Sequence, residues 1–272
     1  MTHLRTPLSG VTRRGLMNSG LQAICAHETP GKCCGAVAYL YGVVDFHKNC
    51  EIYRRRVLDG SGIPIYYHRC SVCQFIFTTA FDHFTREDFQ RYIYNQEYLL
   101  VDPDYPAARP RMNAAFLSSL FSVVRPQRIL DYGGGNGTLA ELLCTAGFTQ
   151  VKTYDPFVPR PADKPAGRFD CVVSFEAVEH STDPARSFAD MNDSLMDAGL
   201  ILFSTLLQPA DIDQQGLNWW YAGPRNGHVS LYSRASLAKV VRPFGLKLRS
   251  FSESMHVLYR EIPDCARHFI KP

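Results

Sequence analysis

A glycine run beside an acidic residue is the feature of this sequence best suited to bind a ligand. The run comprises Asp131, Tyr132, Gly133, Gly134, Gly135, Asn136 and Gly137. Glycine has no Cβ, so the chain can bend sharply here and bring its backbone close to a bound molecule. A dinucleotide-binding turn has glycines at its first, third and sixth positions, whereas Thr138 occupies the sixth position counted from Gly133. The remaining pattern, G-x-G-x-G at Gly133, Gly135 and Gly137, therefore predicts a ligand other than NAD.

Two histidines have the chemistry of a general base. His180 closely follows Phe175 and Glu176 at the end of an apolar segment, and His228 lies in a loop further on. A neutral imidazole can take a proton from a hydroxyl group near neutral pH. We therefore predict that His180 and His228 are catalytic. An orienting hydrogen bond at a helix start is the alternative role for His180, and packing or helix capping is the alternative for His228.

The loop before His228 is rich in aromatic and polar side chains. Both tryptophans of the chain are in it, and its candidate substrate-binding residues are Trp219, Trp220, Tyr221, Arg225 and Asn226. Aromatic faces with a few hydrogen-bonding groups suit a small polar acceptor such as a sugar or a phenol. The tryptophans could equally form an apolar lid over a cofactor.

The first third of the chain contains most of the nine cysteines. Cys70 and Cys73 form a C-x2-C pair, which is typical of zinc sites. Cys34 matches the second member of an earlier pair, but Gly31 occupies the position of the first, so Cys33 or Cys25 has to supply the fourth thiolate. Other candidate ligands are His27, His47, Cys50 and His68. The alternative is a small β module whose thiols pack in its core.

These residues are positioned by an alternation of predicted strands and helices. Strands are expected at Arg128–Tyr132, Val151–Tyr154, Asp170–Phe175, Leu200–Ser204, Leu246–Phe251 and Met255–Tyr259. Helices are expected from Thr138 to Gly147, from Asp183 and Pro184 to Gly199, and from Ser233 through Val241. This alternation predicts a doubly wound, mostly parallel sheet, and Asp155 follows its second strand, where a carboxylate can accept the hydroxyls of a ribose.

The rest of the chain divides by composition. We expect a flexible tail at 1–24, a small β module at 25–80, a helical connector at 81–126 and the sheet domain at 127–272. Thr85 and Asp88 have the spacing of a capping box. Apolar residues then recur at helical spacing, which predicts an amphipathic helix leading into the sheet domain; they are Met112, Phe116 and Leu120, with Leu117 and Phe121.

The glycine run resembles the first motif of class I methyltransferases that use S-adenosylmethionine (SAM), in which an acidic residue stands two places before such a glycine set. Residues 169–180 are similar to the fourth-strand motif of ubiquinone-type O-methyltransferases in the same family. The resemblance implies a Rossmann-like, seven-stranded sheet and SAM as the cofactor. The cofactor-binding residues that it implies are Asp131, Gly133, Gly135, Gly137, Asp155, Phe175 and Glu176. Carboxylates suit SAM because it carries an ammonium and a sulfonium group but no phosphate.

The cysteine-bearing segment looks like the zinc-ribbon modules joined to bacterial methyltransferases of sugar and polysaccharide pathways. That resemblance implies a structural zinc ion held by Cys33, Cys34, Cys70 and Cys73. It also implies a small-molecule or saccharide acceptor, methylated at oxygen.

Composition limits the remaining possibilities. No apolar run approaches the roughly 18 residues of a membrane span, and the start lacks the apolar stretch of a signal peptide, so we expect a cytoplasmic protein. The formal net charge of +3 does not predict a nucleic-acid partner. The alternatives are an RNA methyltransferase that grips phosphates through residues 54–56, a noncatalytic partner protein with the same fold and, least favoured, an NAD-dependent dehydrogenase.

Overall fold

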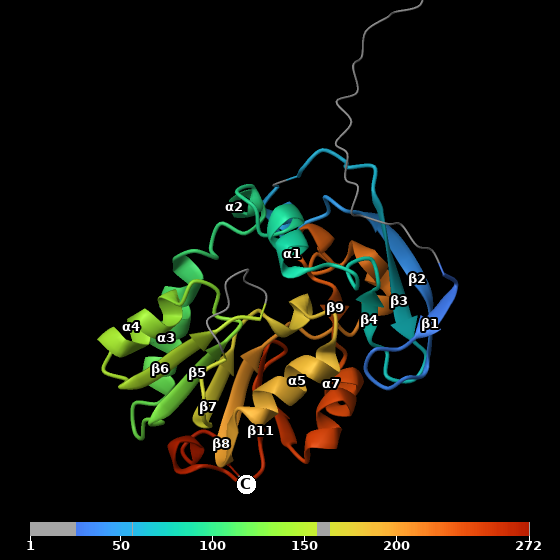
Figure 1. Ribbon diagram of the computed structural model, residues 1–272. Helices are drawn as coiled ribbons and strands as arrows, with labels where there is room; N and C mark the ends of the chain where they lie inside the picture. Colours follow the sequence, from blue (N-terminus) through green and yellow to red (C-terminus); the bar gives the residue numbers. More distant parts are fainter. Residues whose placement is uncertain (1–25, 56, 157–163, 272) are drawn as a thin grey trace, which may run out of the picture.

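The computed structural model describes residues 26–55, 57–156 and 164–271, and it contains two β-sheets with helices around them (Figure 1). Expectations for residues 1–24 and for Cys25 lie outside the described residues. Within the described ranges, no helix is long and apolar enough to cross a membrane.

The larger sheet confirms the predicted Rossmann-like fold class. Its strands are β5 (Arg128–Tyr132), β6 (Gln150–Tyr154), β7 (Phe169–Ser174), β8 (Leu195–Ser204), β10 (Lys247–Ser250) and β11 (Met255–Tyr259). Their spatial order is β10-β11-β8-β7-β5-β6, with parallel pairs from β6 to β8 and antiparallel pairs at β11. The described residues thus contribute six strands where the resemblance implied seven. Residues 157–163, between β6 and β7, lie outside them.

Helices cover both faces of this sheet because its strands are apolar on both sides. The helices are α3 (Ala108–Leu120), α4 (Thr138–Thr145), α5 (Pro184–Asp193) and α7 (Arg234–Val241). Along β5, Ile129 packs with α3 and α4, whereas its neighbour Leu130 packs with α5 and α7. The two cores therefore hold the strand ends of the sheet in fixed positions.

The smaller sheet is antiparallel and combines both ends of the sequence. Its strands, in spatial order, are β1 (Glu28–Pro30), β2 (Val37–Asp45), β3 (Pro64–Cys70), β4 (Ile76–Thr78) and β9 (Ser230–Leu231). Strand β9 pairs Ile76 with Leu231 and Phe77 with Ser230. Strand β9, which begins two residues after His228, thus joins one sheet with the strands of residues 28–78.

Short helices connect the two sheets. They are α1 (Arg86–Tyr92), α2 (Tyr98–Val101) and α6 (Ile212–Gln215). The described residues also form 3₁₀ turns, at Cys50–Arg54, Val178–His180, Gly216–Asn218, Pro224–Asn226, Arg242–Phe244 and Asp264–Ala266. The predicted capping box is present at α1, where the Thr85 hydroxyl accepts from the Asp88 amide and the Asp88 side chain accepts from Thr85.

Two local expectations from the sequence are wrong. Gly199 does not end a helix but lies inside β8, where a Cβ would come within 2.9 Å of the Asp170 carbonyl oxygen. Met112 does not face the core, because it is 69% exposed while the buried face of α3 is formed by Ala114 and Leu117. Leu117 and Phe121, which the same spacing included, are fully buried, so the spacing located part of the buried face and misplaced Met112.

Candidate functional site

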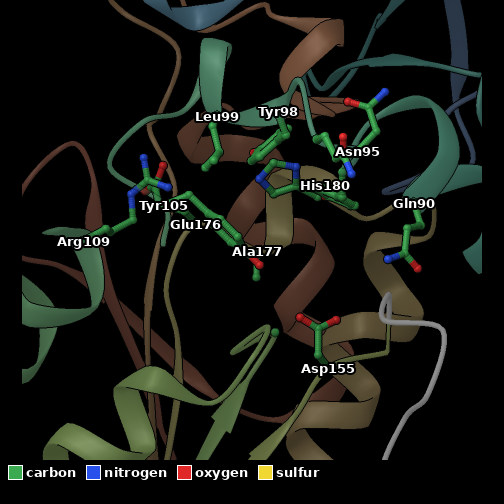
Figure 2. A pocket seen from close by; sticks show the side chains of 13 residues that line it. Gln90, Asn95, Tyr98, Leu99, Tyr105, Arg109, Asp155, Glu176, Ala177 and His180 are labelled. Atoms are coloured by element: carbon green, nitrogen blue, oxygen red, sulfur yellow. The ribbon is translucent and has the colours of Figure 1, made fainter. Parts of the chain in front are cut away.

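A cleft of about 280 Å³ opens where β5, β6 and β7 end (Figure 2). Carboxyl ends of parallel strands share one edge of a sheet, which is the usual ligand position in this kind of fold. The cleft is lined by Gln90, Tyr94, Asn95, Gln96, Tyr98, Leu99, Tyr105, Arg109, Gly133, Asp155, Glu176, Ala177 and His180. Four predicted site residues, Gly133, Asp155, Glu176 and His180, are therefore brought together in one cavity.

The glycine bend after β5 has a shape that other residues would strain. Gly133, Gly135 and Gly137 have φ angles of 75°, 57° and 84°, in the left-handed region that favours glycine. A Cβ on Gly133 would lie 2.6 Å from the Cβ of Ala177. The bend therefore approaches the β7 loop so closely that its backbone forms part of the cleft floor.

Asp131 is buried beneath this bend. It is 2% exposed, and its Oδ2 atom has no hydrogen-bond partner among the residues described. Burial, with a smaller contribution from the nearby charge of Asp155, raises the pKa of Asp131 to about 7. A second, smaller cavity of about 70 Å³ adjoins this carboxylate, and Gly133 and Glu176 line both cavities.

Asp155 connects the ends of β5 and β6. Its Oδ2 accepts a hydrogen bond of 2.8 Å from the backbone amide of Gly135, and its carboxylate points into the cleft (Figure 2). Tyr105 lies over the same bend, since a Cβ on Gly135 would come within 2.6 Å of the Tyr105 hydroxyl. The glycine bend thus lies between the carboxylate of Asp155 and the phenol ring of Tyr105.

Glu176 adopts an unusual backbone conformation, with a φ angle of 50°. Its amide donates to the Ser204 hydroxyl at 2.8 Å, and that hydroxyl donates to Glu176 Oε1 at 2.9 Å. Positive φ in a residue with a side chain is costly and is concentrated at functional sites. Phe175, its neighbour, lines the smaller cavity and packs edge to face on Phe116.

His180 and His228 lie next to each other. Their ring centroids are 4.9 Å apart, and both side chains are buried. Burial, with a contribution from Arg109, lowers the pKa of His180 to about 4, and burial lowers the pKa of His228 well below its usual value. His228 Nδ1 lies 2.8 Å from the Tyr221 carbonyl oxygen, which can only accept, so this nitrogen carries the proton and Nε2 has the lone pair.

Only some residues of the predicted substrate-binding loop line a cavity. Trp220, Tyr221 and Asn226 line a third cavity of about 120 Å³, which also includes Glu176, His180 and His228. Trp219 is buried in the hydrophobic cluster around the smaller sheet.

Arg225 lies inside the protein, where its guanidinium donates to the Ile93 carbonyl at 2.8 Å and to Asn95 Oδ1 at 3.0 Å. Through these two hydrogen bonds Arg225 anchors the segment that follows α1. The Asn226 amide likewise donates to the Val101 carbonyl at 2.8 Å, so both residues hold the segment that covers the cleft.

The covering segment supplies residues that the sequence interpretation missed. Tyr94, Tyr98 and Tyr105 lie between α1 and α3 and line the cleft. Arg109 lines all three cavities and makes a two-pronged ion pair with Asp102, at 2.8 and 2.9 Å. The recurrence of tyrosines over 94–105 was the available signal, but only the fold shows that they face the glycine bend.

The predicted metal cysteines gather in two adjacent loops. The sulfur atoms of Cys34, Cys70 and Cys73 all lie within 4.8 Å of one another, and Cys34 Sγ is 3.5 Å from Cys70 Sγ. A hydrogen bond from the Cys33 thiol lowers the pKa of Cys73 to about 5, and that interaction together with burial raises the pKa of Cys33. Cys50 lies elsewhere, 3.5 Å from His228 Nδ1.

The two loops have the same backbone pattern. The amide of Gly31 donates to the Ala36 carbonyl at 2.8 Å, as that of Cys70 donates to the Phe75 carbonyl at 2.9 Å. Gly35 and Gln74, which follow Cys34 and Cys73, both have positive φ. Gly31 is thus the structural counterpart of Cys70, which explains why the first loop lacks one thiol of the usual pair.

Comparison with known proteins gives one family and several distant structural likenesses. Residues 105–250, more than half of the chain, match a family model described as a methyltransferase domain. A search of curated proteins gave no match.

Among solved structures, an O-methyltransferase family protein from Burkholderia thailandensis is 14% identical, with a TM-score of 0.47 over 66% of this chain and 64% of that one. An O-methyltransferase family 2 protein from Planctomyces limnophilus DSM 3776, in complex with apigenin, is 14% identical, with a TM-score of 0.40 over 57% and 61%. Human N-acetylserotonin methyltransferase in complex with SAM is 12% identical, with a TM-score of 0.43 over 65% and 62%. The chain spans less than two thirds of the length of each.

Proposed function

The chain belongs to the family of methyltransferase domains, and on that premise we propose that it is a SAM-dependent methyltransferase acting on an oxygen of a small-molecule or saccharide acceptor. The observation that carries the proposal is the carboxylate of Asp131, buried beneath the glycine bend with an oxygen that lacks a hydrogen-bond partner in the described part of the chain. A buried acceptor of this kind is costly unless a donor reaches it. The ammonium group of SAM is such a donor.

The residues around the cleft fit the rest of this cofactor. Asp155 is the candidate for the ribose hydroxyls, because its carboxylate points into the cleft beside the bend (Figure 2). Gly133 and Gly135 leave space that a Cβ would fill. Phe175 and Glu176 form the wall on the β7 side. When bound, SAM supplies an electrophilic methyl group.

The protein itself contributes positioning and exclusion of water. Methyl transfer is a direct displacement, so its rate depends on alignment of the acceptor oxygen with the methyl group in a dry site. Tyr94, Tyr98 and Tyr105 cover the cleft, and Arg109 is fixed in place by its ion pair with Asp102. This cover favours an acceptor small enough to enter from the third cavity, where Trp220 and Tyr221 provide aromatic walls.

The acceptor end of the cleft contains His180, with His228 behind it. An alcohol acceptor has to lose its proton, and these two histidines are the predicted place for that loss. Trp219, Arg225 and Asn226 act in this proposal by holding the surrounding loops rather than by direct contact with an acceptor.

We also propose that the cysteine cluster holds a structural zinc ion. Thiolates sharing one zinc at bonds of about 2.3 Å lie roughly 3.8 Å apart, and Cys34 and Cys70 are 3.5 Å apart. Cys73 is the third ligand, and Cys33, which hydrogen-bonds to Cys73, is the candidate for the fourth. Zinc would stabilise a module at 25–80 that is too small to hold a large core alone.

Titration calorimetry with SAM tests the main proposal. We expect the unmodified protein to bind one SAM per chain, and Asp155→Ala and Gly135→Val to abolish binding while circular dichroism shows the fold intact. Asp197→Asn, at a carboxylate that is 90% exposed and far from the cleft, is the matched control. Unchanged SAM affinity in both cleft variants would contradict the site assignment.

A further inference from the structure

Glu179, His180 and His228 form a compact buried group at the acceptor end of the cleft. One ligand atom from each residue lies within 4.8 Å of the other two, and the side chains are 0%, 7% and 6% exposed. Donors that share one ion through bonds of about 2.1 Å lie roughly 3 to 4 Å apart, so small side-chain rotations bring these atoms to coordination distance. Two imidazoles and a carboxylate are a donor set that divalent transition metals take in proteins.

The carboxylate of Glu179 has one oxygen without a hydrogen-bond partner among the described residues. Its Oε1 accepts a hydrogen bond of 2.7 Å from the Tyr221 hydroxyl, whereas Oε2 has no such partner within the ranges that the structure describes. Nearby basic groups are used elsewhere. Arg109 pairs with Asp102, and Lys48 donates to the carbonyl oxygens of the loop at 219–222. An ionised carboxylate buried without a counter-charge costs several kcal/mol or more, which a bound cation would offset.

Tyr221 supports two of the three ligands at once. Its hydroxyl orients Glu179, and its carbonyl oxygen accepts the Nδ1 proton of His228 at 2.8 Å. A histidine that binds a metal through one ring nitrogen almost always donates the other N–H to a carbonyl or carboxylate, which fixes the tautomer and the ring orientation. His228 already has this arrangement, with its Nε2 lone pair available.

The group also borders open space. His180 lines the main cleft and the third cavity, and His228 and Glu176 line the third cavity as well. His180, Glu176 and Ala177 all belong to the lining of the main cleft (Figure 2). An ion held here would have free coordination positions toward an incoming acceptor.

We infer that Glu179, His180 and His228 form a binding site for one divalent transition-metal ion at the acceptor end of the cleft. The site itself follows from the geometry, and only its catalytic role rests on the proposed function. Such an ion would lower the pKa of an acceptor hydroxyl bound to it, so that the O–H bond breaks, the electron pair stays on an oxygen that the ion would stabilise, and the proton passes to bulk solvent. The two histidines are then metal ligands and do not themselves take up the proton.

Binding of Mn²⁺ alone to the full chain tests the site without any assay of activity. Mn²⁺ suits carboxylate and imidazole ligands, whereas thiolates select zinc and other softer ions, so the cysteine cluster interferes little. By electron paramagnetic resonance titration we expect one Mn²⁺ per chain, bound at least about tenfold more weakly by Glu179→Gln and by His180→Gln. Both substitutions keep a polar side chain of similar size. Glu253→Gln, at an exposed carboxylate, is the matched control and keeps the unmodified affinity.

Circular dichroism and thermal unfolding establish that each variant is folded, and His180→Gln decides the question if Glu179→Gln does not fold. The inference is overturned if the unmodified protein shows no saturable Mn²⁺ binding, or if a folded variant of the trio binds Mn²⁺ as tightly as the control. SAM titration in the presence of a chelator separates the two proposals. SAM binding without Mn²⁺ binding refutes the metal site and is consistent with the proposed methyltransferase. Mn²⁺ binding without SAM binding supports the metal site and refutes the proposed methyltransferase.

Discussion

We expect the buried carboxyl of Asp131 to make the free energy of unfolding depend on pH, and this dependence can be measured. Burial and the neighbouring Asp155 raise the pKa of Asp131 from 3.8 to about 7. In the unfolded chain this carboxyl ionises near pH 4, while in the folded protein it keeps its proton to about pH 7. Over that interval the folded state binds more protons than the unfolded state, so the free energy of unfolding falls as the pH rises.

The size of the effect follows from the pKa shift. Each pH unit well between the two pKa values costs about 1.4 kcal/mol, so the loss is about 2 kcal/mol between pH 5 and pH 7 and about 4 kcal/mol in total. The stability contribution of the neutral carboxyl is complete below pH 4 and is lost as the pH rises through 7. Above about pH 8 both states are ionised, and the cost no longer changes.

Asp131→Asn keeps the size of the side chain but removes its ionisation. We expect the unfolding free energy of the variant, relative to the unmodified protein, to rise by about 2 kcal/mol from pH 5 to pH 7 and to level off above about pH 8. Urea unfolding without ligand, followed by circular dichroism at each pH, measures this difference. Asp197→Asn, at the 90% exposed carboxylate, should show no comparable rise.

The same variant should lose SAM affinity, because an amide cannot supply the charge that attracts an ammonium group. A stability difference between Asp131→Asn and the unmodified protein that stays flat with pH would refute the buried, raised-pKa carboxyl. A variant that binds SAM as the unmodified protein does would remove Asp131 from the cofactor site.

Two further predictions concern the parts that frame the cleft. Arg109→Leu should destabilise the protein by about 3 kcal/mol in urea unfolding, because Asp102 is left buried without its partner. Adding Asp102→Asn to this variant should restore part of the lost stability. Equal stability of Arg109→Leu and the unmodified protein would show that the ion pair contributes nothing to stability. Cys73→Ser should abolish zinc retention in metal analysis of the purified protein and lower its melting temperature. The control Cys144→Ser, at an exposed thiol, should change neither the zinc content nor the melting temperature. A Cys73→Ser protein that retains zinc would exclude Cys73 as a ligand.

Local patterns were sufficient to predict strand β5 and the glycine bend that follows it. The apolar run at 128–132, followed by glycines and then a helix, depends on residues that are close in sequence, and the structure has strand β5, the bend and α4 there. The same holds for the capping box of Thr85 and Asp88, because its hydrogen bonds span three residues. Short-range chemistry of this kind is visible in a sequence.

Long-range packing was not visible in the same way. Nothing near Tyr105 indicates that its hydroxyl lies against Gly135, and Glu179 gains its significance only beside Tyr221 and His228. The error at Met112 has the same origin, since the buried face of α3 is chosen by contact with α4 and the sheet rather than by spacing. Residues that act through tertiary contact have to be found in the folded chain.

The smaller sheet is part of the candidate site rather than an independent attachment. The Tyr67 hydroxyl, on β3, donates to the His228 carbonyl at 2.7 Å, and the residues directly after His228 form β9 beside β4. The Ser233 hydroxyl, three residues after Ser230, donates to the Cys73 carbonyl at 2.6 Å. Since the cysteine loops fix the end of β3 and the start of β4, they also fix the backbone on which His228 is held. The proposed zinc ion would therefore influence the position of His228, even though those loops do not line the cleft.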